Sequence, residues 1–179
     1  MRLQPKNKLG FSLIEMMITI AIFLIISSAT FLTLATGRTY WYSGRTQLVV
    51  QQEARRGLNY MASELRQSAS IKIQFTGLPD SDGYYNNITF NIPQDTTGDG
   101  NAATGGNLEW SGNIAYSLAG LNNAQLIRTT TSSSKVLANN ISSIKFKRII
   151  NTNILEIKIT AQKQTTQNYW ISTTLETKV

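Results

Sequence analysis

An uncharged apolar segment near the N-terminus constrains the fold of this chain more than any other feature. No charged side chain occurs from Met16 to Gly37, and isoleucine and leucine are frequent there. A run of roughly 22 residues is long enough for a helix that crosses a membrane core of about 30 Å. Because the bilayer interior offers no hydrogen-bond partners to the backbone, a single segment crosses it as a helix. The sequence therefore predicts a transmembrane helix over residues 11–37.

A carboxylate and a basic leader precede this segment. Glu15 stands at the edge of the apolar run, where an ionisable group is costly and therefore indicates a functional role. Arg2, Lys6 and Lys8 lie upstream. Basic residues beside a first span stay in the cytoplasm, which places the leader inside and the C-terminal part across the membrane. A secretory signal peptide has a shorter apolar core of about 7–15 residues, whereas a plain signal anchor shares the flank and the span but does not require Glu15.

The junction Gly10-Phe11-Ser12-Leu13-Ile14-Glu15 resembles the processing site of type IV prepilins and type II secretion pseudopilins. The resemblance implies that a prepilin peptidase removes residues 1–10 by cutting after Gly10. It also implies N-methylation of Phe11, the new first residue, and an assembly role for Glu15 as the fifth residue of the mature chain. The glutamate is expected to pair with the terminal amine of a neighbouring subunit or with its own amine, one helical turn away.

The remaining residues, 38–179, are expected to form one soluble head. Residues 38–70 continue as an amphipathic helix, in which apolar residues recur at spacings of four, three, four and four. This stripe consists of Ala54, Leu58, Met61, Leu65 and Ala69. Tyr40, Trp41 and Tyr42 fit either a ring of aromatic residues at the membrane interface or packing in the head. Gly37, Gly44 and Gly57 are weak points of the helix, each costing roughly 1 kcal/mol relative to alanine.

Residues 71–179 show the period of two that is typical of half-buried antiparallel strands. Residues 88–92, 114–118, 144–150, 155–161 and 169–175 alternate in this way, and residues 71–75 form another candidate strand. Asn151-Thr152-Asn153 predicts a hairpin turn between two of them. The expected fold class is α+β: a long N-terminal helix packed on an antiparallel β-sheet, which is the pilin fold that the resemblance also implies.

The residue composition argues against an enzyme. The chain has no cysteine and no histidine, so the common zinc ligands and the usual Ser-His and Cys-His nucleophile pairs are missing. The formal net charge is +7, but three of the basic residues lie in the leader. The small excess of basic over acidic residues in the rest of the chain gives little support for binding of nucleic acid.

Two polar stretches, residues 93–107 and 129–134, are predicted to be surface loops. In the first, Asp95, Asp99 and Asn101 stand at relative positions one, five and seven, with Gly100 at position six, as at the start of a calcium loop. The third position is a threonine and the twelfth is Gly106. A calcium site and a plain solvated loop are therefore both considered, and no other cofactor is expected.

Two further segments resemble the PilW-type minor pilins and the J-type minor pseudopilins. The first is residues 52–68, where an arginine-rich turn is followed by a small, an apolar and an acidic residue and then by Leu-Arg. The second is residues 136–146. The resemblance implies a structural subunit in the inner membrane that helps to start or assemble a type IV pilus. The expected partners are other pilins, the prepilin peptidase and the inner-membrane assembly platform. A pseudopilin of a type II secretion system and a tip protein that binds DNA, a surface or cargo are the alternatives.

Overall fold

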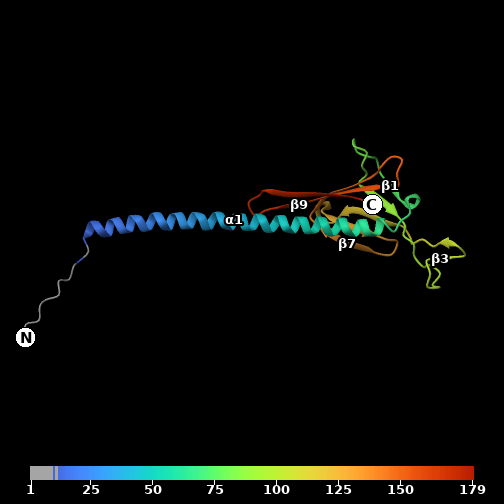
Figure 1. Cartoon of the computed structure of the whole chain (residues 1–179), viewed down its shortest axis with the longest axis horizontal. Coiled ribbons are helices and arrows are strands. Elements are labelled where there is room, and N and C mark those ends of the chain that lie inside the picture. The colour runs from blue at the N-terminus through green and yellow to red at the C-terminus, as the bar shows by residue number, and fades with distance from the viewer. Residues whose placement is uncertain (1–9, 11) are drawn as a thin grey trace, which may run out of the picture. The chain divides into compact units, whose positions relative to one another are not determined.

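The structure is a computed structural model that describes residue 10 and residues 12–179 (Figure 1). Within that part the chain forms one α-helix, two short 3-10 helices and ten strands. The chain divides into two compact units, Met1–Tyr42 and Ser43–Val179. Helix α1, Leu13–Leu65, contributes its first part to the N-terminal unit and its second part to the C-terminal unit, which we call the head.

The first part of α1 is suited to an apolar surrounding. Among the described residues, α1 is the helix that is long and apolar enough to cross a membrane. Its hydroxyl side chains donate hydrogen bonds to backbone carbonyls one turn earlier, as Ser28 does to Leu24 at 2.7 Å and Thr33 to Ala29 at 2.9 Å. Such bonds leave fewer polar groups without a partner in lipid. The polar residues within the span are therefore compatible with a membrane.

The second part of α1 packs through the predicted stripe. Ala54, Leu58, Met61 and Leu65 are all buried in the head core, which confirms the four-three-four spacing. The helix ends at Leu65 and not near residue 70 as expected. The N–H groups of Gln67 and Ser68 bond three residues back, to Glu64 at 3.0 Å and Leu65 at 3.2 Å, and this tighter winding ends the α-helix. A 3-10 helix, η1 (Ser70–Lys72), follows.

The strands form two main antiparallel sheets and not the single sheet that was expected. The first sheet has the order β1-β2-β5-β6-β7 and the second has the order β10-β9-β8. A separate pair, β3 and β4, interrupts the predicted loop 93–107. The first sheet comprises β1 (Gln74–Thr76), β2 (Asn87–Phe90), β5 (Ile114–Ala119), β6 (Gln125–Thr129) and β7 (Ser134–Asn139). The others are β8 (Ile141–Arg148), β9 (Leu155–Gln164) and β10 (Trp170–Lys178), with β3 (Ala103–Thr104) and β4 (Asn107–Leu108).

The registers confirm most of the alternating segments. Ile144 pairs with Ile159 across β8 and β9, and both side chains are buried. The hairpin predicted between these strands is present, and Asn151 adopts a left-handed φ of 61° in its turn. Strands β6 and β7 were not predicted, and the polar run 129–134 connects them. The candidate strand 71–75 begins later, at Gln74, after η1.

Gly57 lies where α1 approaches the strands too closely for a side chain without a shift of its neighbours. A Cβ atom at this position would lie 2.8 Å from Cδ1 of Ile159 on β9 and 3.0 Å from Cδ2 of Leu126 on β6. It would also lie 3.4 Å from Cβ of Ala138 on β7. Figure 1 shows strands of both sheets beside this part of the helix. The glycine that the sequence marks as a weak point therefore permits α1 to contact both sheets.

Candidate functional site

Gly10, the last residue of the expected leader, stands between residues that the structure does not describe. It is exposed, and a Cβ atom there would have no heavy atom within 4 Å apart from its chain neighbours. Phe11 and residues 1–9 lie outside the described residues, so cleavage at this bond and methylation of Phe11 stay predictions.

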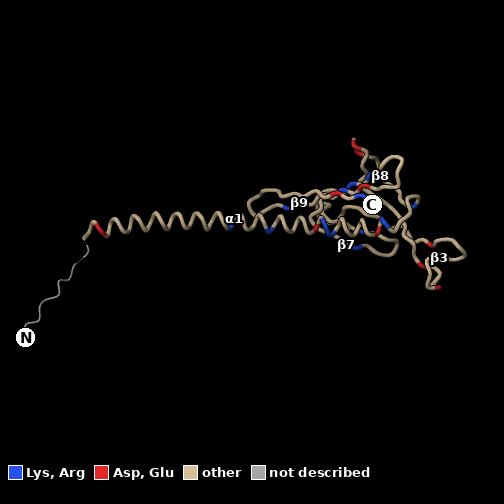
Figure 2. Tube along the Cα trace, viewed as in Figure 1, with Lys and Arg blue, Asp and Glu red and all other residues tan. Residues whose placement is uncertain are grey.

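Glu15 lies in the first turn of α1 and is exposed. The helix opens with a hydrogen bond from the Met16 N–H to the Ser12 carbonyl at 3.2 Å. A carboxylate in the first turn interacts favourably with the positive end of the helix dipole. Among the described residues, Glu15 has no ion-pair partner. The sequence has no other charged residue between Glu15 and Arg38, and Figure 2 shows a long uncharged stretch in α1. Glu15 can therefore still pair with either expected partner, the terminal amine of a neighbouring subunit or the terminal amine of its own chain.

The model of the prokaryotic N-terminal methylation motif matches residues 5–31. The chain carries the motif of type IV prepilins and pseudopilins. This match covers the basic leader end, Gly10, Phe11, Glu15 and much of the apolar segment, and it supports a pilin-type protein that prepilin peptidase processes. No curated protein and no solved structure matches the chain. The pilin fold class, a long helix packed with antiparallel sheets, agrees with the motif.

Exposed aromatic residues follow the apolar segment of α1. Tyr40 and Trp41 are 74% and 73% exposed, and Tyr42 is 53% exposed. Rings with a polar atom are suited to the boundary between lipid and water. Because these residues belong to the N-terminal unit, the other interpretation, packing in the head, stays untested. The apolar helix found among the described residues fits single-pass membrane anchoring.

A polar contact that the sequence did not reveal joins α1 to the first sheet of the head. Glu64 Oε2 lies 2.9 Å from Nε of Arg128 on β6, and the Tyr116 hydroxyl on β5 donates to the same carboxylate. Burial, aided by Glu64, raises the pKa of Tyr116, and the hydrogen bond to Glu64 raises the pKa of Arg128. The phenol and the guanidinium therefore remain protonated donors.

A second helix carboxylate binds the end of the last strand of the first sheet. Glu53 Oε2 accepts a hydrogen bond of 2.6 Å from the backbone N–H of Asn139, the last residue of β7. The next residue, Asn140, has a left-handed φ of 58° and connects β7 to β8. Glu53 therefore holds α1 at the point where the chain passes from one sheet to the other.

The loop predicted as a candidate calcium site forms its own hydrogen bonds. Asp95 accepts hydrogen bonds from the N–H groups of Gly98 and Gly100, at 2.6 and 2.8 Å. Asp99 Oδ1 accepts one from the N–H of Asn101 at 2.8 Å. Among the described residues, no three acidic side chains are grouped to hold a metal ion. Calcium binding here stays a prediction, and it would require these carboxylates to exchange backbone donors for a cation.

Glu109, which the sequence did not single out, is the centre of this loop. Its carboxylate accepts hydrogen bonds from the Thr96 N–H at 2.6 Å and the Thr97 N–H at 3.1 Å, and also from the Thr104 hydroxyl. The hydrogen bonds from Thr104 and Thr96 lower the pKa of the Glu109 carboxyl from 4.5 to about 2. The ionised carboxylate therefore organises the loop.

Proposed function

We propose that this chain is a minor pilin, which prepilin peptidase cuts between Gly10 and Phe11 and which then takes part in the assembly or priming of a type IV pilus. The observation that supports this most directly is the methylation motif over residues 5–31, followed by a helix of membrane-spanning length. The role is structural and not enzymatic, and the partners are other pilins and the inner-membrane assembly platform.

The position of Gly10 in the sequence supports the processing step. It directly precedes Phe11 inside the matched methylation motif, and it is exposed. The basic leader places this bond on the cytoplasmic side and the head on the other side of the membrane.

The minor role rests on the resemblance of residues 52–68 to PilW-type pilins. This segment carries both Glu53 and Glu64, the two carboxylates through which α1 contacts the first sheet. The same resemblance extends to J-type pseudopilins, so a minor pseudopilin of a type II secretion system is the second candidate. The two candidates share the processing step and differ in the filament that the subunit enters.

The processing step is tested by co-expression with a prepilin peptidase and intact-mass analysis of the membrane-extracted protein. The native chain should lose residues 1–10 and gain one methyl group, whereas the Gly10→Val variant should keep its leader. Gly37→Ala is the matched control, because a Cβ atom at Gly37 would likewise have no heavy atom within 4 Å. A native protein that retains Met1 to Gly10 would contradict the proposal.

The minor role is tested separately in the native cell. Quantitative mass spectrometry of sheared pili should find this subunit far below the major pilin in amount, and deletion of the gene should reduce the number of filaments. Recovery in secretion filaments alone would favour the pseudopilin. A subunit as abundant as the major pilin would contradict the minor role while leaving the processing step intact.

A further inference from the structure

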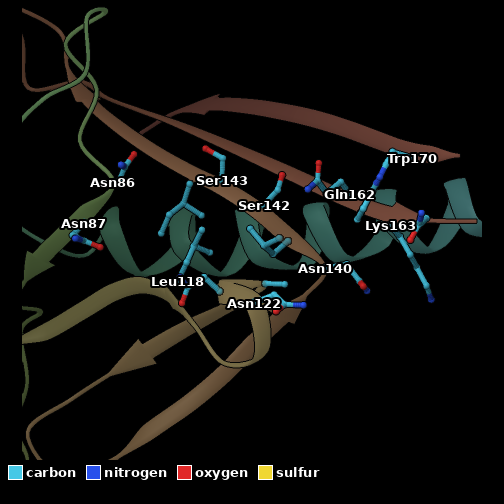
Figure 3. Close-up of a pocket in the computed structure, with 15 residues that line it drawn as sticks. Asn86, Asn87, Leu118, Asn122, Asn140, Ser142, Ser143, Gln162, Lys163 and Trp170 are labelled. Carbon is cyan, nitrogen blue, oxygen red and sulfur yellow. The ribbon is translucent and has the colours of Figure 1, made fainter. Parts of the chain in front are cut away.

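A cavity of about 730 Å³ lies in the head, where the end of the first sheet meets the outer edge of the second (Figure 3). Amide side chains line it from several separate parts of the chain. Asn86 and Asn87 come from the start of β2, Asn122 from the 3-10 helix η2 (Leu121–Asn123), Asn140 from the β7–β8 connection and Gln162 from β9. Its volume is in the range of small-molecule sites. Figure 3 shows Asn86 and Asn87 at one end and Trp170 and Lys163 at the other.

The lining amides are free to bind a ligand. Among the described residues, no side-chain hydrogen bond involves Asn86, Asn87 or Gln162. Asn122 and Asn140 have left-handed φ values of 57° and 58°, for which asparagine is suited, so their presence has a backbone explanation. The other three have no such conformation. Each amide offers both donors and an acceptor, which is what a hydroxyl-bearing ligand requires.

The Asn86 end of the cavity is held in place by the loop before it. Tyr84 is buried, and its hydroxyl donates to Glu156 of β9 at 2.5 Å. The Tyr84 ring also lies 4.7 Å from the ammonium of Lys158. Asp80, at the start of this loop, forms an ion pair of 2.7 Å with Lys145 of β8. These contacts fix the loop on the second sheet, so the amides that follow it have a defined position.

Trp170 supplies an apolar face at the other end. It is the first residue of β10, pairs with Gln164 of β9 and remains 63% exposed. The turn before it is ordered, since the Thr165 N–H donates to the Tyr169 carbonyl at 2.8 Å. An exposed indole on a backbone fixed by strand pairing provides a flat surface, and a tryptophan side chain has few rotatable bonds to immobilise.

The charge of the lining selects the chemical class of the ligand. Among the described residues that line the cavity there is no carboxylate, and Lys163 is the one charged side chain. A cation would find no charged ligand, and a polyanion would find one ammonium group. Neutral amides, the hydroxyls of Ser142 and Ser143 and one indole match a neutral molecule with many hydroxyl groups and apolar C–H faces.

The edge of β8 in the cavity is too short to bind an added peptide strand. At one end the Ile141 N–H donates to the Ala124 carbonyl at 3.0 Å. At the other end Phe146 and Tyr85 exchange two backbone hydrogen bonds of 2.8 Å. Four residues, 142–145, lie between these points, and only alternate residues of a strand present their backbone groups at one edge. A stable added strand needs a longer open edge.

We propose that this cavity, which we call the amide groove, binds a neutral carbohydrate, with Trp170 stacked on a sugar ring and the amides of Asn86, Asn87 and Gln162 bonded to its hydroxyls. This proposal is independent of processing at Gly10. It gives the head a ligand of defined class: a neutral glycan segment from a cell surface, a polysaccharide matrix or solution.

The test uses the full chain in a detergent without sugar groups, such as dodecyldimethylamine oxide, because maltoside detergents would compete for the groove. The probes are neutral tetrasaccharides of glucose, mannose, galactose and N-acetylglucosamine, measured on an array and then by titration calorimetry. At least one should bind. Its affinity should not change with salt up to about 0.5 M, since no charge pairing is involved.

Trp170→Ala should lower the affinity about tenfold or more, the equivalent of about 1.4 kcal/mol. Asn86→Ala should weaken it by a smaller factor, and Trp170→Phe should keep part of the binding. Trp41→Ala is the control, since Trp41 is also largely exposed but lies on the first part of α1. Because Trp170 is exposed, the thermal unfolding midpoint of its variants should match that of the native chain.

Three results would overturn the proposal. They are binding of no neutral tetrasaccharide, binding that Trp170→Ala leaves unchanged, and binding of acidic glycans alone that salt removes. Crystals or spectra that place a peptide strand along β8 would assign the groove to a protein partner instead.

Discussion

Glu64 of α1 and Arg128 of β6 form an ion pair of 2.9 Å inside the head, with side chains only 13% and 18% exposed. The Tyr116 hydroxyl shares the same carboxylate. A buried pair adds little net stability over apolar residues, but removal of one partner is costly because the other charge is left alone. The contact therefore fixes the position of α1 along the first sheet.

We expect Glu64→Ala to lower the free energy of unfolding of the head by about 3 kcal/mol, since Arg128 and the Tyr116 hydroxyl then lose their acceptor. Glu176→Ala is the control: its pair with Lys158, at 3.3 Å, is exposed and should be worth less than about 1 kcal/mol. The measurement is urea unfolding of the full chain in micelles, followed by near-ultraviolet circular dichroism. Equal losses for both variants would argue against a special role of Glu64.

Replacement of Gly57 should reveal the close approach of α1 to the two sheets. Gly44→Ala, where a Cβ meets nothing within 4 Å, should stabilise the helix by up to about 1 kcal/mol. Gly57→Ala should lose that advantage and destabilise the head, because overpacking in a core costs about 1–3 kcal/mol.

The Ile159→Val substitution removes the nearest atom to the new methyl group, so it should cost less in the Gly57→Ala background than alone. Thermal unfolding of the native chain, the two single variants and the double variant gives this coupling. Gly57→Ala as stable as Gly44→Ala would mean that the neighbouring side chains move aside freely.

The sequence predicted those parts of the fold that depend on local periodicity. The stripe from Ala54 to Leu65 and the alternation in β8 and β9 each repeat over enough residues to indicate one buried face. Strand β6 has five residues and is followed by a polar run that reads as a loop, so the pattern there is too short. The division of the strands into two sheets depends on which strands pair, and local periodicity does not contain that information.

The polar sites depend on residues that are far apart in the chain. Glu64 is 64 residues from Arg128, and Glu53 is 86 residues from Asn139. Nothing near either glutamate in sequence distinguishes it from a solvated helix carboxylate. The amide groove likewise gathers Asn86, Asn140 and Trp170 through the pairing of sheets. By contrast, the processing motif is contiguous, and it was therefore recognised from Gly10 and Glu15.

The loop around Glu109 should lose its order in acid. The folded-state pKa of this carboxyl is depressed from 4.5 to about 2, so its contribution to loop stability is full above pH 4.5 and disappears as the pH falls toward 2. The amides of Thr96 and Thr97, which donate to it, should lose protection from hydrogen exchange over that range. Glu109→Gln should expose both amides already at neutral pH. A carboxyl that titrates near 4.5 by NMR would contradict this account.

Millimolar calcium should leave the melting temperature of the full chain unchanged. Backbone N–H groups of Gly98 and Gly100 already satisfy Asp95 and hold its pKa below the usual value. A cation would have to displace these donors. If the loop does bind calcium, the melting temperature should rise by mass action, and Asp99→Ala should abolish the rise. A rise that magnesium does not reproduce would establish the calcium site that the spacing of Asp95, Asp99 and Asn101 suggests.

Substitution of Glu15 should separate processing from assembly. Glu15 lies in the first turn of α1 without an ion-pair partner among the described residues. If it pairs with the new terminal amine of a neighbouring subunit, Glu15→Ala and Glu15→Val should both be cleaved normally and enter filaments poorly. The valine fits an apolar surrounding but carries no charge to set the axial position of the subunit.

Met17→Leu, an uncharged change on the same helix, should assemble as the native chain does. The measurement is the ratio of this subunit in sheared filaments to that in the membrane fraction, by quantitative mass spectrometry. Normal ratios for both Glu15 variants would show that the carboxylate has no part in assembly.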